Sequence, residues 1–242
     1  MSTYKKTNFI IGILIISLIT SIVSVLYISF YKKTNTLASV FNSKKHTQDD
    51  INETIVKLEQ GIVMITSKGN STTGIILNDE GYILTHELLD KTTHKVFLQD
   101  GVQINYKKIE SKDSNNLGLN LIKVDSKYAH SFVHLGNSDN IKKGQVIYSI
   151  SNLFGYFGSV TRGIVSITNT SIGTFNGLML TDAVAHDGSL GGAIFDDTQK
   201  ILGIILDYYV DLDTKYNSGL GVVLPVNKVK LFLEDNLVNY LE

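Results

Sequence analysis

The chain has 242 residues and a formal net charge of -1, from 22 basic and 23 acidic side chains, with no cysteine, no tryptophan and one proline. The lack of cysteine excludes a disulfide framework and a thiolate nucleophile or zinc ligand, and the near-neutral charge argues against a nucleic-acid-binding protein. A hydrophobic fraction of 43% with 19% charged residues is typical of a folded chain.

The N-terminal segment is predicted to be a membrane anchor. After a short tail, residues 1–8, no charged residue occurs from Phe9 to Tyr31, where Ile, Leu and Val dominate. As a helix that rises about 1.5 Å per residue, this run reaches roughly 30 Å, the thickness of a bilayer core. It is longer than the about 7–15 apolar residues of a cleavable signal peptide, so we expect an uncleaved, single-pass transmembrane signal anchor at 9–31. Lysine pairs flank the run on both sides, so charge alone does not set its orientation.

Residues 32–50 are predicted to be a stalk, because they are rich in Lys, Thr, Asn and Ser and lack apolar periodicity. The four lysines that flank the anchor account for the neutral total. Without them, 18 basic residues remain against 23 acidic ones, and the net charge is -5. We therefore expect residues 51–242 to form a mildly acidic domain. Because the anchor lies in the cell membrane, this domain is expected outside the cytoplasm.

Residues 51–242 are predicted to form one all-β domain with a helix at each end. A short helix is expected at Ile51–Glu59, and a final helix with an apolar stripe is expected from Val226. Between them, short apolar runs alternate with turn signals, such as Asp100-Gly101 in a hairpin, which favours a sandwich or closed barrels. Strands are expected at Gly61–Thr66, Gly74–Leu77, Tyr82–Thr85, Lys95–Leu98, Val102–Tyr106, Leu119–Val124, Val146–Ser149, Gly163–Thr168, Leu178–Thr181, Ala193–Phe195, Ile201–Asp207 and Gly221–Pro225.

Four motifs occur in the order and at the spacing of one protease family. They are Thr73–Leu77 with Gly81–Thr85, Ile150–Gly155 with Ser159–Ser166, Thr181–Ala193, and Gly219–Pro225. Residues 56–230, about seven tenths of the chain, therefore resemble the trypsin-like protease domain of the HtrA/Deg family. The resemblance implies the chymotrypsin fold, two six-stranded β-barrels with a cleft between them. Members of this family often carry a PDZ domain after the protease, and none is expected here.

The resemblance breaks at the catalytic triad. A serine protease needs a nucleophilic serine, a histidine base within hydrogen-bond reach and a carboxylate that orients this histidine. Aligning Gly191-Gly192-Ala193 with the family's S-G-G-A places Leu190 in the nucleophile position, next to Ser189. Aligning Leu119–Val124 with the family's L-A-V-L-K-I places Gly118 in the acid position.

The histidine position has two candidates. The family reads T-x-x-H-V-V after the hairpin, whereas this chain reads T-H-E-L-L-D from Thr85 to Asp90. Matching Leu88-Leu89 to V-V places Glu87 in the histidine position. A two-residue deletion before His86 instead places His86 there, and the segment up to the next turn is indeed about two residues short. Both alignments therefore stay open.

The backbone of the reactive turn is expected to keep its function. An oxyanion hole needs only backbone N–H donors, and the resemblance assigns them to Gly188 and Leu190. No metal or other cofactor is expected, since neither the H-E-x-x-H zinc motif nor the spacing of a calcium loop is present. Candidate residues of a peptide-binding cleft are the aromatic side chains of Phe154, Tyr156 and Phe157, with Tyr208 and Tyr209.

Three functions are compatible with these observations. The first is a membrane-anchored, extracytoplasmic, HtrA-like pseudoprotease that binds an extended peptide or a protein partner by strand addition. In a protease of another fold, loss of the nucleophile or base costs about 10⁶ in kcat. The alternative is a serine-type endopeptidase with a rearranged site that uses Ser189 and His86. A third is a structural or assembly factor in which the barrels are a spacer. No pattern indicates an oligomeric state, and nucleic acid is not an expected partner.

Overall fold

A computed structural model of the protein describes residues 20–32, 48–86, 94–112, 117–129, 131–210, 217–236 and 238. The chain divides into two compact units, Met1–Thr47 and Gln48–Glu242. In the first unit, residues 20–32 are helical and exposed. Within the described residues, we find no helix of the length and apolar character needed to cross a membrane. Residues 1–19 lie outside the described part, so the anchor at 9–31 stays a prediction.

The second unit begins with helix α2, Gln48–Gln60. Its buried side chains, Ile51, Thr54 and Leu58, recur every three or four residues and form one face. The helix confirms the predicted one and starts earlier, so that it includes the last three residues of the predicted stalk. The rest of that stalk, residues 33–47, lies outside the described residues.

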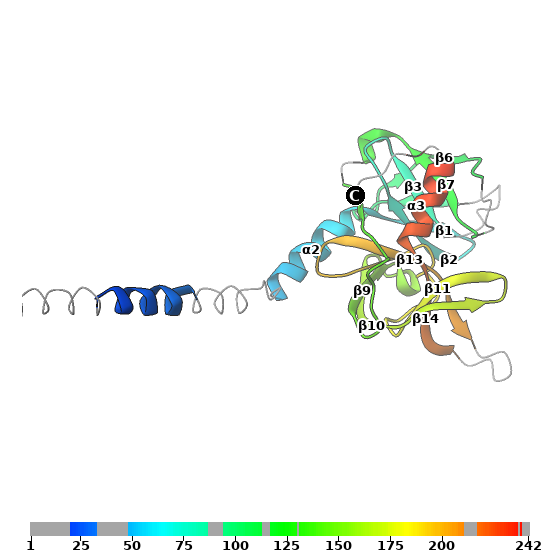
Figure 1. Ribbon diagram of the computed structural model, residues 1–242. Helices are drawn as coiled ribbons and strands as arrows, with labels where there is room; N and C mark the ends of the chain where they lie inside the picture. Colours follow the sequence, from blue (N-terminus) through cyan, green and yellow to red (C-terminus); the bar gives the residue numbers. More distant parts are fainter. Residues whose placement is uncertain are drawn as a thin grey trace, which may run out of the picture. The chain divides into compact units, whose positions relative to one another are not determined.

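The first barrel consists of antiparallel strands in the order β5-β4-β1-β2-β3-β7-β6. The strands of this sheet in the described part of the chain are β1 Ile62–Ser67, β2 Asn70–Ile76, β3 Tyr82–Thr85, β4 Lys95–Phe97, β5 Gln103–Ile104, β6 Tyr106–Ile109 and β7 Asn120–Val124. Only residue 105 separates β5 from β6, so these two act as one interrupted strand. With β5 and β6 counted as one, the sheet corresponds to the predicted six-stranded barrel, part of which is labelled in Figure 1.

The second barrel has the order β12-β9-β10-β11-β14-β13-β8, and an additional pairing of β12 with β13 closes a six-stranded ring. Its strands in the described residues are β8 His134–Leu135, β9 Val146–Ser151, β10 Ser159–Ile172, β11 Phe175–Thr181, β12 Ala193–Phe195, β13 Lys200–Val210 and β14 Asn217–Pro225. The sequence did not predict β8, because a two-residue strand shows no alternation. It pairs in parallel with β13, outside the ring.

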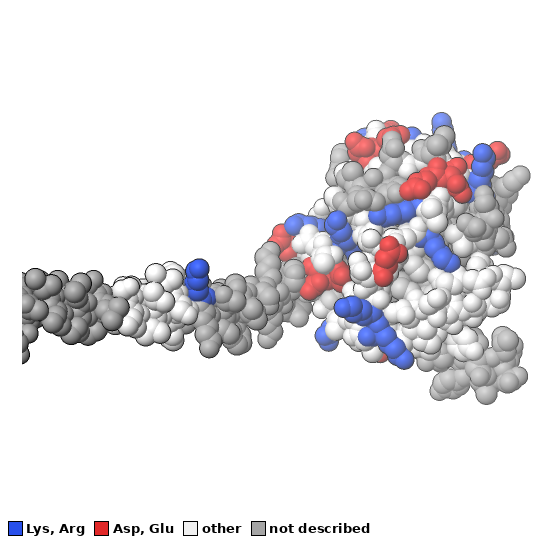
Figure 2. Space-filling view, viewed as in Figure 1, with Lys and Arg blue, Asp and Glu red and all other residues white. Residues whose placement is uncertain are grey.

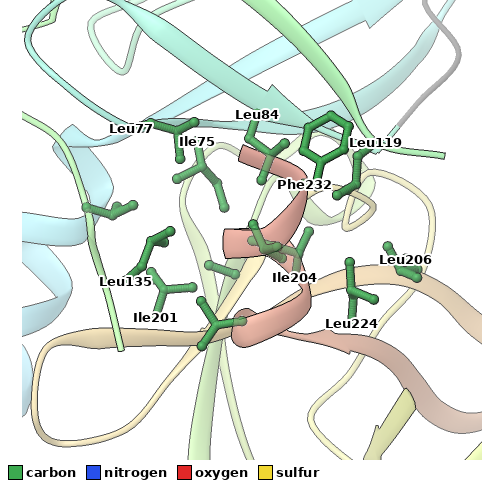
Figure 3. Close-up of a cluster of buried hydrophobic side chains, with 14 of the residues drawn as sticks. Ile75, Leu77, Leu84, Leu119, Leu135, Ile201, Ile204, Leu206, Leu224 and Phe232 are labelled. Carbon is green, nitrogen blue, oxygen red and sulfur yellow. The ribbon is translucent and has the colours of Figure 1, made fainter. Parts of the chain in front are cut away.

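Helix α3, Val226–Asp235, follows β14 directly, as predicted. Its buried face joins a hydrophobic cluster that both barrels share (Figure 3). In this cluster Phe232 of the helix lies with Leu84 of the first barrel and Ile204 of the second. The structure therefore confirms a double β-barrel with a C-terminal helix, and the shared core fixes the two barrels against each other.

Charged side chains of both signs are interspersed on the face of the second unit shown in Figure 2. Two of the ion pairs, Lys57–Glu53 at 2.8 Å and Lys123–Glu80 at 3.4 Å, are solvent-exposed. Exposed pairs of this kind contribute little to stability. The candidate site is therefore located by backbone geometry.

Candidate active site

The turn between β11 and β12 contains most of the Thr181–Ala193 motif. Ser189 N donates to His186 O at 2.9 Å, which closes a four-residue turn. Gly188, at the third position of this turn, has a φ of 88°. A positive φ at this position, with none at Asp187, is that of a type II turn. A Cβ at residue 188 would also lie 2.1 Å from Asn152 O, so both backbone angle and space require glycine.

Hydrogen bonds fix the orientation of two peptide groups in this turn. Asp187 O accepts from Phe154 N at 2.7 Å, and Ser189 O accepts from Gly192 N at 2.9 Å. Because a trans peptide directs its C=O and N–H to opposite sides, the N–H groups of the next two residues, 188 and 190, point away from these donors. Neither N–H group takes part in a hydrogen bond within the described residues. They are the two donors that the resemblance assigns to an oxyanion hole, an assignment that stays a prediction.

Strand β2 of the first barrel holds the turn by hydrogen bonds. Thr73 Oγ1 donates to Gly188 O at 2.9 Å and accepts from Asn152 N at 2.9 Å. Leu190 O accepts from Thr73 N at 2.9 Å and from Thr72 Oγ1 at 2.7 Å. The side chain of Asn152 is itself fully buried. A turn of the second barrel is thus attached to strand β2 of the first.

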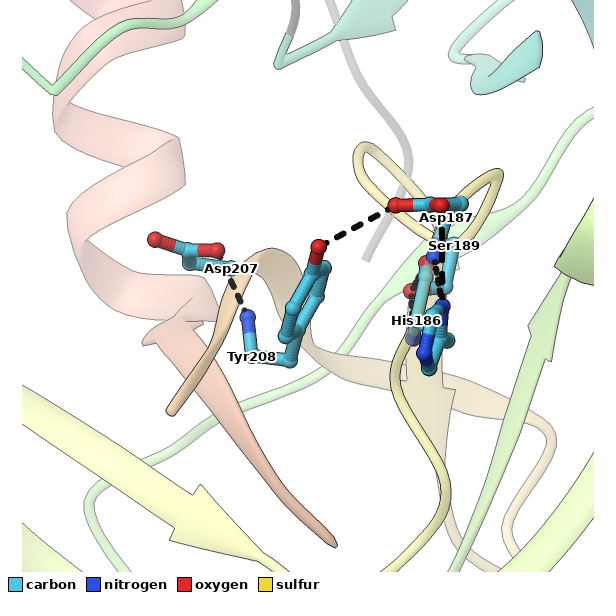
Figure 4. Close-up of polar contacts among 5 residues, drawn as sticks. All are labelled: His186, Asp187, Ser189, Asp207 and Tyr208. Atoms are coloured by element: carbon cyan, nitrogen blue, oxygen red, sulfur yellow. Dashed lines mark hydrogen bonds and ion pairs between the residues drawn. The ribbon is translucent and has the colours of Figure 1, made fainter. Parts of the chain in front are cut away.

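Ser189 and Leu190 differ in accessibility. Ser189 is fully buried, and its Oγ donates to His186 O at 2.6 Å and accepts from His186 N at 2.9 Å (Figure 4). A nucleophilic hydroxyl must reach both substrate and base, whereas this hydroxyl is enclosed in the turn. Leu190 is half-buried and lines a cleft of about 670 Å³. The cleft is lined by Met64, Thr66, Gly69, Asn70, Ser71, Phe154, Gly155, Asp187, Gly188 and Leu190.

His86 lies beside Gly118, because Thr85 of β3 is paired with Asn120 of β7. A Cβ added at Gly118 would lie 2.8 Å from His86 Nε2, so the imidazole occupies the space that a side chain at 118 would need. An orienting carboxylate accepts from a histidine through its terminal oxygen, at about 2.6–3.2 Å, which places the ring well beyond the Cβ of the acid. The ring as it lies here is too close for that geometry. Glu87 lies outside the described residues.

Aromatic rings gather around His186. The ring centroids of His186 and Phe154 are 4.5 Å apart, and those of His186 and Tyr208 are 5.1 Å apart with an interplanar angle of 14°. Phe154 has a φ of 52°, unusual for a bulky residue, and its side chain is exposed. Of the five aromatic cleft candidates, Phe154 lines the cleft, whereas Tyr208 and Tyr209 do not. Tyr156, which is exposed, and Phe157, which is half-buried, do not line it.

Tyr208 connects the turn to strand β13. Its hydroxyl donates to Asp187 Oδ1 at 3.1 Å, and its backbone N donates to Asp207 Oδ1 at 2.8 Å (Figure 4). Burial raises the pKa of the Tyr208 phenol, as do the hydrogen bond to Asp187 and the charges of both carboxylates. Asp187 N also donates to His186 Nδ1 at 2.8 Å. The sequence grouped Tyr208 with Phe154 as a cleft candidate but did not predict its contacts with His186 and Asp187, because these residues lie far apart in the chain with no fixed spacing.

Comparisons with known proteins identify similar chains. A family model described as the trypsin-like peptidase domain matches residues 72–204. A probable periplasmic serine endoprotease, DegP-like, from Bartonella henselae is 34% identical over 161 residues, 65% of this chain and 31% of that protein. A serine protease Do-like HtrA from Lactobacillus helveticus is 26% identical over 218 residues, 86% of this chain and 51% of that protein. This chain spans about a third of the length of the first curated relatives it matches.

Solved structures of similar fold include two of the HtrA-type protease AlgW. The structure with a decapeptide has a TM-score of 0.65 at 21% identity, over 77% of this chain and 67% of that chain. The structure with a tripeptide has a TM-score of 0.61 at 26% identity, over 76% of this chain and 61% of that chain. These matches agree with the double β-barrel described above.

Proposed function

Because this chain belongs to the trypsin-like peptidase domain family, with HtrA- and DegP-like serine proteases among its relatives, we propose that it is a membrane-anchored member without proteolytic activity that binds an extended peptide. One observation carries the proposal. The His86 ring occupies the space of a side chain at 118, while Leu190 stands where the aligned motif has its nucleophile. We therefore infer that the chain has no nucleophile, base and acid arranged for catalysis.

The magnitude of this loss supports an inactive protein. Loss of the nucleophile or base of a serine protease lowers kcat about 10⁶-fold, and the oxyanion hole with substrate binding retains only roughly 10³–10⁴ over water. The alternative, an endopeptidase that uses Ser189 with His86, is less well supported. Its nucleophile would have to leave two hydrogen bonds inside the turn and become exposed.

Peptide binding is supported by the cleft beside Leu190 and by one edge of β13. An extended peptide adds to such an edge through backbone hydrogen bonds, and pockets between side chains select its sequence. The solved AlgW structures contain a decapeptide and a tripeptide. A protein partner that offers an extended segment satisfies the same requirement.

The anchor at 9–31 is part of the proposal. Its support is the uncharged apolar run in the sequence, and several relatives carry the word periplasmic in their names. The anchor places the barrels next to a membrane, outside the cytoplasm, so that their ligands are extracytoplasmic segments.

The test is a proteolysis assay on the full-length chain. The chain is expected in the membrane fraction and is purified from it in detergent. Casein is expected to stay intact, and a fluorescent serine-reactive phosphonate is expected not to label the protein. Hydrolysis or labelling that disappears in Ser189→Ala but persists in the matched control Ser159→Ala would establish the endopeptidase instead. Recovery of the chain in the soluble fraction would contradict the anchor.

A reverse experiment tests the assigned positions. Leu190→Ser alone is expected to leave casein intact. Combining Leu190→Ser with Gly118→Asp and Glu87→His is expected to create measurable hydrolysis. Because the new carboxyl group would meet the ring of His86, the combination is also made with His86→Ala. If every combination is inert although it folds, the alignment of the positions is wrong.

A further inference from the structure

Strand β13 has an open edge next to the turn. β12 pairs with β13 only as far as Ile204, and Ile205 then exchanges hydrogen bonds with Gly191 and Gly192 at 2.8 Å. Beyond that point, β14 still pairs with one side of β13. In the described part of the chain, no strand pairs with the other side at residues 206–208, which we call the open edge. It continues directly from the residues that hold the turn.

The carboxylate of Asp207 covers a hydrogen-bond donor of this edge. Tyr208 N donates to Asp207 Oδ1 at 2.8 Å. In an added antiparallel strand, such an N–H donates instead to a carbonyl group of the incoming chain. Charged side chains protect exposed strand edges in many proteins, and a local aspartate–backbone bond competes with sheet pairing. Asp207 therefore occupies the place that a carbonyl group of a peptide would take.

The ring of Tyr208 has two contacts with the turn, whereas in the described residues the Asp207 carboxylate has its one bond to Tyr208 N. The ring stacks on His186, and its hydroxyl donates to Asp187. Asp207 is exposed, and within the described residues its carboxylate makes no second hydrogen bond or ion pair. In Figure 4, Asp207 lies on the side of Tyr208 away from the turn. A rotation of the Asp207 side chain thus uncovers the N–H without disturbing the stack.

We infer that Asp207 gates the open edge and selects peptides with a basic side chain. This inference rests on the proposed peptide binding and adds a ligand class to it. A lysine or arginine near the bound strand pairs with the Asp207 carboxylate and draws it away from Tyr208 N. An acidic peptide is repelled by Asp207 and Asp187 and leaves the gate closed. The gate therefore couples charge recognition to strand addition.

The test measures affinities of the full-length chain in detergent by fluorescence anisotropy. The probes are two fluorescein-labelled short peptides with alternating Val and Thr, one flanked by Lys and one by Glu. The wild type is expected to prefer the Lys-flanked peptide by about 1.5-fold to fivefold, the range of an exposed ion pair. Asp207→Ala uncovers the N–H and is expected to bind the Glu-flanked peptide about threefold to tenfold more tightly than the wild type.

Two further variants separate charge from hydrogen bonding. Asp207→Asn keeps an acceptor oxygen without the charge, so the preference for lysine is expected to fall while the edge stays covered. The matched control is Asp100→Ala in the β4–β5 turn, where Asp100 Oδ1 accepts from Val102 N at 3.0 Å. It removes a comparable aspartate–backbone bond and one negative charge, and it is expected to change neither affinity.

The outcomes distinguish failure of the Asp207 gate from failure of the proposed peptide binding. If the wild type binds the peptides and Asp207→Ala leaves both affinities unchanged, the gate is wrong and the peptide-binding function stands. If neither peptide binds the wild type or Asp207→Ala, strand addition fails together with the gate. Hydrogen exchange gives a second readout. The Tyr208 amide is expected to lose protection in Asp207→Ala and to regain it when peptide is added, and thermal unfolding verifies that each variant is folded.

Discussion

The backbone of the turn at 186–192 and the side chains at 86, 118 and 190 form two contrasting halves of one site. In the turn, the carbonyl groups of residues 186–190 accept hydrogen bonds from defined donors, and glycine stands where a Cβ would collide. The three side-chain positions hold an imidazole, a hydrogen atom and an isobutyl group. The first half has the ordered backbone on which the proposed oxyanion hole depends, while the second half holds the side chains on which the proposed loss of activity depends.

The backbone of the turn is held in place independently of the side chains at 86, 118 and 190. The turn is fixed by contacts with residues 73 and 152, which also hold the two barrels together. Its geometry is therefore required for stability and does not depend on catalysis. The side chains at 86, 118 and 190 are not part of these contacts, so the turn does not depend on their chemistry.

The largest effect is expected for Gly188→Ala, which tests the rigidity of the turn. A Cβ there meets Asn152 O at 2.1 Å, and φ is 88°. Backbone strain of about 1–2 kcal/mol and overpacking of about 1–3 kcal/mol should together lower the free energy of unfolding by roughly 2–5 kcal/mol. Urea denaturation measures it.

The matched control for this variant is Gly144→Ala, where φ is 84° and no atom lies within 4 Å of the added Cβ. Only the backbone strain of about 1–2 kcal/mol is expected there. Equal losses in the two variants would mean that the turn yields to the new methyl group, and the contrast between a rigid backbone and changeable side chains would break.

A smaller effect is expected for Gly118→Ala, which tests the position of the His86 ring. The added Cβ lies 2.8 Å from His86 Nε2, and a side-chain end can move. We expect a loss of about 1–3 kcal/mol in the free energy of unfolding, which includes strain from a φ of 71°. In a His86→Ala background, the loss should fall to that of Gly101→Ala, whose φ is 80° with no atom within 4 Å.

This double-variant cycle isolates the contact between residues 86 and 118, with an expected coupling of about 0.5–1.5 kcal/mol. Urea unfolding of the four proteins at one pH provides it. An absent coupling would place the imidazole elsewhere and reopen the possibility that His86 acts as a base.

The smallest effect is expected for Tyr208→Phe, which removes the hydroxyl that links β13 to the turn. One exposed hydrogen bond to Asp187 contributes about 0.5 kcal/mol at about pH 7. Because the folded-state pKa of Tyr208 is raised, this contribution is complete below the unfolded value of about 10. It disappears as the pH rises through the folded-state pKa.

Unfolding free energies of wild type and Tyr208→Phe at about pH 7 and above the tyrosine pKa, with Tyr156→Phe as the exposed control, measure this dependence. The difference between wild type and Tyr208→Phe should shrink at the higher pH. A difference that grows with pH would mean that the phenolate is stabilised in the fold, against the causes given above.

Local pattern predicted much of the fold and little of the site. Strands β3 and β12 occupy the predicted residues because apolar runs bounded by turn residues define both of their ends. The prediction that Leu190 stands in the nucleophile position rests on Gly191 and Gly192, which fix the alignment beside it. The contact of His86 with Gly118 could not, because it depends on the pairing of β3 with β7 and on a ring rotamer. The enclosure of the Ser189 hydroxyl could not be predicted either, because it depends on the geometry of the turn.

The attachment of the turn to β2 has a consequence for the order of folding. The hydrogen bonds from Thr72 and Thr73 to Leu190 and Gly188 join residues 118 and 115 positions apart. Contacts between such distant segments form late, after each segment has assembled its local structure. We therefore expect the hydrogen bonds between the turn and β2 to form only when both barrels have folded and docked. During synthesis, Thr72 and Thr73 therefore emerge from the ribosome well before residues 186–190, and their bonds to the turn are expected to form after the second barrel is complete.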